Sequence, residues 1–157
     1  MTDFKNITII TAGLNELELV AQLFDQHRVF CKQKSAFLEG RAYLKKRIER
    51  QESVIFLAVD ETSDGDIKPL GFVQLYPTFS TLSMKRVWIL NDLFVDPTAR
   101  RNGVAKQLML EAKAFVMGTG AKGLRVETAI DNTKAQSLYE SLGYQKDVRG
   151  FHYHYYF

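Results

Sequence analysis

The chain of 157 residues contains only one cysteine, three prolines and one tryptophan. The single cysteine, Cys31, excludes an internal disulfide and favours a reducing compartment, so we expect a cytoplasmic protein. No apolar run approaches the roughly 20 residues that span a bilayer, and no signal-peptide pattern is present. These absences predict a soluble protein with no membrane partner.

Charge of one sign is also scarce. The 21 Lys and Arg residues nearly balance the 18 Asp and Glu residues, which gives a formal net charge of +3 spread along the chain. This distribution provides no basic stripe for nucleic acid, so no nucleic-acid partner is expected. A hydrophobic content of 46% in 157 residues is enough for one core and too little for two. We therefore expect a single domain over residues 1–157.

Hydrophobic periodicity predicts strands alternating with helices, without repeats or linkers. Pro77 is expected to end one strand, and Ser35 is expected to cap one helix. The expected strands are residues 7–11, 54–59, 70–76, 85–95, 124–129, 144–148 and 151–157, and the expected helices are residues 14–28, 35–50, 103–117 and 133–142.

The most informative stretch is R-R-N-G-V-A at residues 100–105, between an apolar strand and a helical repeat. A helix N-terminus has unpaired N–H groups and partial positive charge, which together bind phosphate. Gly103 lets the backbone approach a bulky diphosphate, while Arg100, Arg101 and Lys106 add positive charge. The spacing matches neither the P-loop nor the dinucleotide fingerprint. A surface helix start that carries two arginines has the same pattern, so this stretch alone leaves both interpretations open.

A second motif follows the strand at residues 124–129. R-x-x-G-x-A after a strand, then a strand, then N-x-x-A-x-x-x-Y-x-x-x-G-Y at residues 132–144 resembles the acetyl-CoA-binding core of the GNAT superfamily of N-acetyltransferases. The resemblance covers residues 88–144. It implies an α/β (α+β) fold with a mixed, mostly antiparallel sheet and helices on both faces. Strands 85–95 and 124–129 would lie parallel and splay apart.

The resemblance also implies acetyl-CoA as co-substrate, with no metal. The acetyl group would pass to a primary amine of a small molecule or peptide, by direct attack in a ternary complex. A non-catalytic module of the same fold that binds or senses acyl-CoA is the alternative. The implied cofactor contacts are the backbone groups of Leu93, Phe94 and Val95 along the pantetheine, Arg100, Arg101, Asn102, Gly103, Val104, Ala105 and Lys106 at the diphosphate, and Asn132, Ala135 and Tyr139 at the pantetheine and thioester.

An amine must lose a proton to attack a thioester, so the site needs a base. Asp92, beside Asn91 on the strand at residues 85–95, is the first candidate, and Glu127 on the neighbouring strand is the reserve. Strand alternation places Asn91 and Asp92 on opposite faces unless a bulge resets the phase. A structural carboxylate is the competing interpretation of Asp92.

Tyr139 is the candidate general acid, because a nearby phenol can protonate the thiolate that leaves. Its spacing with Ala135, Leu138 and Leu142 also suits a core aromatic. The distance in sequence from Asn132, together with the family pattern, favours the catalytic interpretation.

The segment F-H-Y-H-Y-Y-F at residues 151–157 carries His152 and His154 on one face, but no third metal ligand lies nearby in sequence, so no metal site is expected. A terminal aromatic strand favours pairing with another chain, which predicts a possible homodimer. An interior strand of the chain's own sheet is the alternative. Residues 27–41 and 151–157 more loosely resemble a microbial GNAT subgroup related to polyamine and histone-tail acetylases.

Overall fold

The structure is a computed structural model that describes residues 4, 6–62 and 64–157. The chain forms two compact units, Met1–Val126 and Glu127–Phe157. The expectation of a single domain stays a prediction.

The first unit is built on one sheet, which has five strands in the described part of the chain, in the order β1-β2-β3-β4-β5. The first four strands are antiparallel to their neighbours, whereas β5 is parallel to β4. The mixed, mostly antiparallel sheet expected from the sequence is therefore confirmed. The strands are β1 (Ile7–Thr11), β2 (Val54–Glu61), β3 (Ile67–Ser80), β4 (Lys85–Val95) and β5 (Gly123–Val126).

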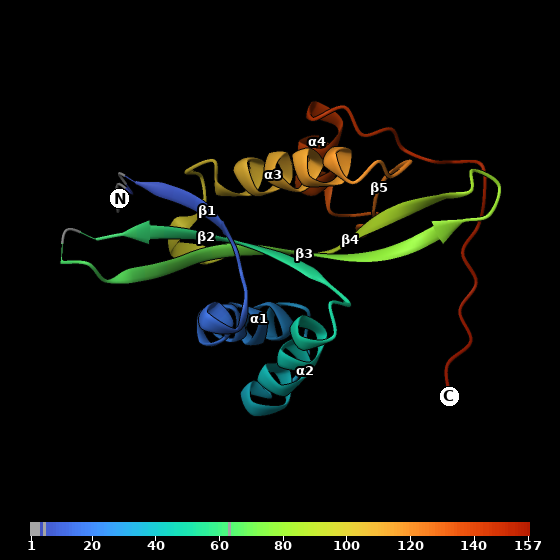
Figure 1. Ribbon diagram of the computed structural model, residues 1–157. Helices are drawn as coiled ribbons and strands as arrows, with labels where there is room; N and C mark the ends of the chain where they lie inside the picture. Colours follow the sequence, from blue (N-terminus) through green and yellow to red (C-terminus); the bar gives the residue numbers. More distant parts are fainter. Residues whose placement is uncertain (1–3, 5, 63) are drawn as a thin grey trace. The chain divides into compact units, whose positions relative to one another are not determined.

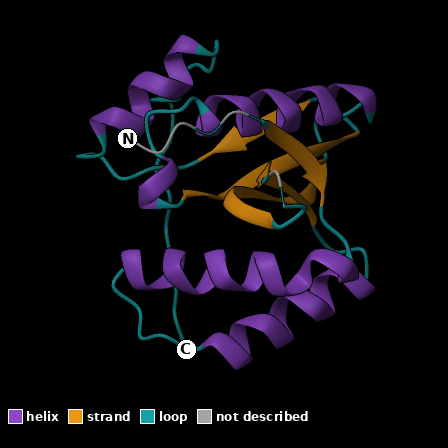
Figure 2. Cartoon of the chain, turned by 90° about the vertical axis from the view of Figure 1, so that its left-hand side faces the viewer, coloured by secondary structure: helices purple, strands orange, loops and turns teal. Residues whose placement is uncertain are grey.

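Helices cover both faces of this sheet (Figure 1). The helices α1 (Leu17–Phe30) and α2 (Phe37–Glu49) lie on one face, and α3 (Val104–Gly118) lies on the other. Figure 2 shows the twisted strands between the helices. The apolar side of each amphipathic helix packs on the sheet, and this burial is the main force that holds the layers together. On the α1 face the buried core includes Val20, Leu23, Leu44, Leu57, Phe72 and Phe94.

A carboxylate in the second half of α1 fixes the start of α2. Asp25 accepts hydrogen bonds from the hydroxyl of Ser35 at 2.6 Å and from the backbone N–H of Ala36 at 2.8 Å. These two bonds lower the pKa of Asp25. The expected cap, Ser35, was wrong: Ala36 is the N-cap residue, and the side chain of Asp25 binds the donors there.

The predicted end of β3 at Pro77 was also wrong, because β3 continues to Ser80. Its ladder with β2 stops where Val54 pairs with Leu75, and from there β3 pairs with β4 alone. A proline lacks one backbone donor and is tolerated where a strand has a free edge. Pro77 lies opposite Trp88 in this one-sided part of the ladder.

The second unit contains one helix, α4 (Thr133–Ser141), and within residues 127–157 it contains no strand. The expected strands at residues 144–148 and 151–157 were therefore wrong. Their aromatic side chains are exposed, with Phe151 at 89% and Tyr155 at 85%. Alternating residues form a strand only when their backbone groups pair with a neighbouring edge, which this segment lacks here.

Within residues 4, 6–62 and 64–157, no helix is both long enough and apolar enough to cross a bilayer.

Candidate functional site

A bulge in β4 determines which of its side chains share a face. Gln74 pairs with Asp92, but the next residue of β3, Leu75, pairs with Leu90, so Asn91 is left over in the described ladder. An extra residue of this kind shifts the alternation by one position. The bulge therefore resets the phase at Asn91, which is the case that the sequence left open.

The shift places Asp92 and Trp88 on opposite faces of the sheet. The carboxylate of Asp92 lies 3.3 Å from Nε2 of His27 on α1. The indole of Trp88 lies 5.1 Å from the ring of Phe115 on α3, and its Nε1 donates to the hydroxyl of Thr119 at 3.2 Å. Asp92, the candidate base, thus faces α1, whereas Trp88 belongs to the core beneath α3.

Three neighbours donate hydrogen bonds to Asp92 or lie within bonding reach of it, and together we call these four residues the Asp92 cluster. Oδ2 of Asp92 accepts from Nε2 of Gln74 at 3.0 Å and from Nδ2 of Asn91 at 3.1 Å, while Oδ1 faces His27. Burial of the Asp92 carboxyl raises its pKa, but its contacts with His27, Gln74 and Asn91 outweigh burial, and the pKa is lowered. Asp92 is therefore an anchored anion at neutral pH.

Aromatic side chains surround this anion on the α1 face. The hydroxyls of Tyr43 on α2 and Tyr76 on β3 are 2.8 Å apart. Burial, the hydrogen bond to Tyr43 and the nearby charge of Asp92 raise the pKa of Tyr76, so its phenol stays neutral. The exposed ring of Phe30 lies 6.2 Å from that of Phe94. Such surroundings suit an amine that carries some apolar surface.

Sequence analysis missed His27 and Gln74. Gln74 is fully buried and is the one polar residue in the apolar stretch G-F-V-Q-L-Y at residues 71–76, which is a signal that sequence alone could have provided. His27 follows Leu23 by one helical turn on the buried side of α1. Only the packing of α1 on the sheet identifies its partner.

The second half of β4 has an open edge. β5 pairs with β4 from Val87 to Leu90 and then ends. Residues 93–95 continue to pair with β3, but no described strand lies on their other side. The parallel pairing of β4 and β5 is confirmed. An extended ligand could pair with the open edge as an additional strand.

The chain then enters α3 through a loop with unusual backbone angles. Arg101 has φ 66° and Gly103, the N-cap of α3, has φ 75°. A Cβ at Gly103 would meet no atom of the described chain within 4 Å, so it is this left-handed angle that favours glycine. The amide of Asn102 donates to the carbonyls of Ala99 and Arg100 at 3.2 and 3.0 Å and holds the loop in shape.

This geometry directs free donors outward from the start of α3. The helical hydrogen bonds begin with the N–H of Gln107 bound to the carbonyl of Gly103 at 3.1 Å. The N–H groups of residues 104–106 precede that bond and have no acceptor within the helix. Arg101 and Lys106 are exposed beside them. The loop therefore has the donors and charge of an anion site.

Arg100 has a different environment from Arg101. Its Nε donates to the carbonyl of Val95 at 3.2 Å, and its guanidinium lies 5.5 Å from the centre of the Phe30 ring. Arg100 thus connects the end of β4 to α1. Its expected contact with the diphosphate stays a prediction.

In the second unit, the motif at residues 132–144 forms a capped helix. Oδ1 of Asn132 accepts from the N–H of Ala135 at 3.1 Å, and Gly143, at φ 89°, ends the helix. The ring of Tyr139 is half-buried, 6.0 Å from that of Tyr144, and burial raises the pKa of Tyr139. Asn132 therefore has a structural role of its own, and Tyr139 stays protonated at neutral pH.

The candidate residues thus fall into two sets. Asn91, Asp92 and residues 93–95 lie on β4, which leads directly into residues 100–106 of the first unit. Glu127, Asn132, Ala135 and Tyr139 belong to the second unit, where Glu127 is exposed. Within the described ranges, no three His, Cys, Asp or Glu side chains gather in a way that could hold a metal ion.

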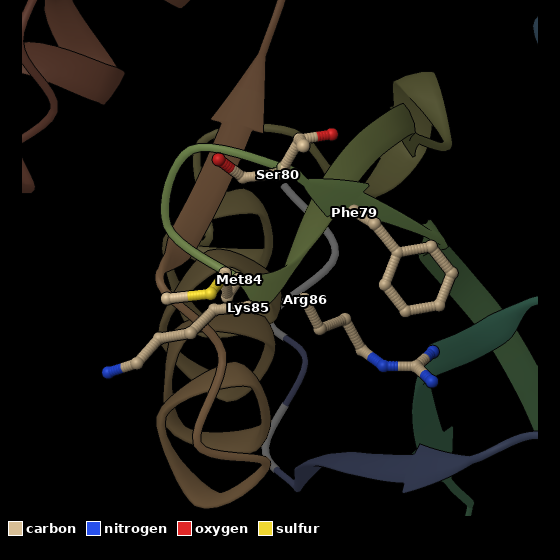
Figure 3. Close-up of a pocket in the computed structure, with 6 residues that line it drawn as sticks. Phe79, Ser80, Met84, Lys85 and Arg86 are labelled. Carbon is tan, nitrogen blue, oxygen red and sulfur yellow. The ribbon is translucent and has the colours of Figure 1, made fainter.

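A surface hollow at the tip of the β3–β4 hairpin is a separate feature (Figure 3). The guanidinium of Arg86 lies 5.1 Å from the centre of the Phe79 ring there. No member of the Asp92 cluster lines this hollow, so we do not assign it to the site. Its lining consists of Phe79, Ser80, Thr81, Met84, Lys85 and Arg86.

Residues 18–144 match the family model described as the acetyltransferase (GNAT) family. The chain belongs to this family. It is 44% identical over 147 residues to an uncharacterized N-acetyltransferase, YhfO, of Bacillus subtilis (strain 168), covering 94% of this chain and 95% of that protein. These matches confirm the resemblance seen in the two motifs and, with it, the enzyme class, an acetyl-CoA-dependent N-acetyltransferase.

Solved structures agree with this membership. The crystal structure of a probable acetyltransferase superposes on the chain with a TM-score of 0.88 at 44% identity, covering 96% of this chain and 97% of that one. The aminoglycoside N-acetyltransferase AAC(6')-Iy in complex with CoA has a TM-score of 0.77 at 21% identity, covering 99% of this chain and 98% of that one. The second likeness shows the fold alone.

Proposed function

We propose that this GNAT protein transfers the acetyl group of acetyl-CoA directly to a primary amine of a small molecule, with both substrates bound in a ternary complex. The main support is that the Asp92 carboxylate, the open edge at residues 93–95 and the anion-binding loop follow one another in a single segment. The structural neighbour AAC(6')-Iy is an aminoglycoside N-acetyltransferase in complex with CoA, and this likeness favours a small cationic amine and the same acyl donor.

In this proposal the cofactor is bound mainly by backbone groups. Residues 93–95 pair with the pantetheine arm, and the N–H groups of residues 101–106 bind the diphosphate. Asn132 and Ala135 contact the pantetheine side. Backbone recognition of this kind needs little specificity in the side chains, which leaves the α1 face free to select the amine.

The chemistry is a single displacement. The amine nitrogen attacks the thioester carbonyl carbon, a C–N bond forms, and the C–S bond breaks as CoA thiolate leaves. Tyr139, whose phenol stays protonated, gives its proton to the thiolate. The proton that the amine loses passes to a base, for which the carboxylate of Asp92 is the first candidate and that of Glu127 the reserve.

The direct test is release of free thiol from acetyl-CoA over a panel of polyamines, amino acids, aminoglycosides and basic peptides. We expect turnover on one class of amine. Tyr139→Phe should lower kcat about 10-fold or more while leaving the Kd for acetyl-CoA nearly unchanged. Equal turnover by this variant would remove Tyr139 from the mechanism. No thiol release with any amine of the panel, with acetyl-CoA still bound in calorimetry, would contradict catalysis and favour a binding module.

A homodimer through residues 151–157 is a second part of the proposal. Its support is the exposure of five aromatic side chains, Phe151, Tyr153, Tyr155, Tyr156 and Phe157, in a segment that forms no strand here. Light scattering after size-exclusion chromatography should show the mass of a dimer for the full-length protein and the mass of a monomer for a chain truncated after Gly150. The same oligomeric state before and after truncation would contradict a dimer through residues 151–157. The cytoplasmic location rests on the single cysteine and stays a prediction.

A further inference from the structure

His27 lies in the last turn of α1, between two aromatic rings of the sheet. Its ring centre is 6.0 Å from that of Phe72 and 5.5 Å from that of Phe94, and its side chain is 17% exposed. These contacts fix the plane of the imidazole. They leave one nitrogen, Nε2, facing Oδ1 of Asp92 at 3.3 Å.

The carboxylate selects the tautomer of this imidazole. An ionised carboxylate only accepts hydrogen bonds, so Nε2 carries the proton and the lone pair of a neutral ring lies on Nδ1. Nδ1 points away from Asp92, toward the exposed Cys31, whose Sγ is 3.9 Å away. His27 therefore presents a basic nitrogen on the outer side of the Asp92 cluster.

Asp92 itself is poorly placed to take a proton. Both of its oxygens already face donors, two of them bonded to Oδ2 and one facing Oδ1. Burial raises the pKa of Asp92, but these contacts outweigh it and lower the pKa, which makes the carboxylate a weaker base. Imidazole is the side chain whose ordinary titration lies nearest to neutral pH.

We propose that His27, oriented by Asp92, is the group that accepts the proton of the attacking amine. This inference rests on the proposed acetyl transfer. As the C–N bond forms, the N–H proton moves to Nδ1 of His27, and the imidazolium is stabilised by the anionic carboxylate on its other side. The C–S bond breaks, and the CoA thiolate is protonated by Tyr139. Asp92 is a positioning residue in this scheme.

Two other titratable groups face this pair. Burial and the negative charge of Asp92 raise the pKa of Cys31, so its thiol stays neutral and does not compete for the role of anion. Burial, the hydrogen bond to Tyr43 and the negative charge of Asp92 raise the pKa of Tyr76 on β3, so its phenol stays neutral. The pair thus forms the ionisable centre on this face, with Phe72 and Phe94 as its apolar neighbours.

The test is the pH profile of kcat/KM on an amine that the wild type acetylates. A base must be neutral to act, so wild-type kcat/KM should fall as the pH drops through the titration of His27. His27→Gln should lower kcat about 100-fold and remove this limb, whereas the amine's own titration is common to both proteins. Added imidazole should restore part of the activity of His27→Ala. Gln26→Ala, an exposed neighbour on α1, is the control and should retain the wild-type profile.

Two readouts keep the outcomes distinct. Thermal unfolding and acetyl-CoA calorimetry check that each variant folds and binds the donor. The nitrogen NMR signals of the neutral His27 ring should show the proton on Nε2 in the wild type and a changed tautomer in Asp92→Ala, and this holds even without turnover. A wild type that acetylates no amine would refute the proposed function. An active wild type whose pH limb survives in His27→Gln, or an unchanged His27 tautomer in Asp92→Ala, would overturn the role of the pair alone.

Discussion

The two halves of β4 differ in how their backbone is paired. Residues 87–90 pair with β3 on one side and β5 on the other, and Val87, Trp88 and Leu90 are buried. Residues 91–95 include the bulge at Asn91, the Asp92 carboxylate and the open edge, and of these residues 92–95 pair with β3 alone. One strand thus has a structural half and a half whose polar groups are available for chemistry.

The boundary between the halves is the bulge at Asn91. It shifts the alternation of side chains, so that Trp88 contacts Phe115 of α3 whereas Asp92 faces His27 of α1, and it lies next to the point where β5 ends. A strand fully paired on both sides would have no backbone groups left for a ligand. One end of β4 is therefore unpaired on one side, and the fully paired end holds it in place.

The largest expected effect is on the free energy of unfolding, and it comes from removing a buried side chain in the fully paired half of β4, residues 87–90. Trp88→Ala should destabilise the protein by about 3–5 kcal/mol, because it removes a buried ring that packs on Phe115 and a hydrogen bond to Thr119. Denaturant unfolding measures this change. Ile130→Ala, at a side chain that is 97% exposed, is the control and should leave stability nearly unchanged. A loss below about 1 kcal/mol for Trp88→Ala would show that this half is less structural than its burial indicates.

The next effect comes from changing the loop that follows the open half. Gly103→Val should weaken acetyl-CoA binding about tenfold or more, because a β-branched residue disfavours the left-handed backbone angle at φ 75° and crowds the diphosphate. Calorimetry with acetyl-CoA provides the measurement. Gly118→Val, at the other end of α3 and without a positive φ, is the matched control. Equal binding by both variants would refute the loop assignment.

The smallest expected effect is the pH dependence of stability that Asp92 contributes. Because the folded-state pKa of Asp92 lies below its ordinary value near 3.9, its ionised form adds stability above about pH 4, and this stability is lost as the pH falls through the folded pKa. The free energy of unfolding should therefore decline less between pH 5 and pH 2 in Asp92→Asn than in the wild type. Equal slopes would show that the carboxylate contributes no such stability.

Much of the first unit was predictable from local pattern. β1 and β4 have the bounds that the sequence predicted, because each alternates or runs apolar between clear breaks. The loop at residues 100–105 also has the expected form, since the glycine and the helix start are local features. Strand bounds and loop shape of this kind depend on residues that are close together in the chain, so they can be inferred from the sequence.

The remaining features depend on partners far away in the chain. The phase of β4 depends on where its ladder with β3 skips Asn91, and the partner of Asp92 depends on how α1 packs, so neither could be derived from the segment itself. The strands expected at residues 144–157 were wrong for the same reason: alternation is local, whereas a strand needs an edge. The roles of Tyr139, Asn132 and Glu127 in catalysis and cofactor binding stay predictions.

The most direct test of the open edge is a crystal structure of this protein with acetyl-CoA bound. We predict backbone hydrogen bonds between the pantetheine amides and residues 93–95 of β4, with the diphosphate on the N–H groups at the start of α3. Acetyl-CoA bound away from both, with the edge of residues 93–95 unoccupied, would contradict the functional assignment of this half of β4.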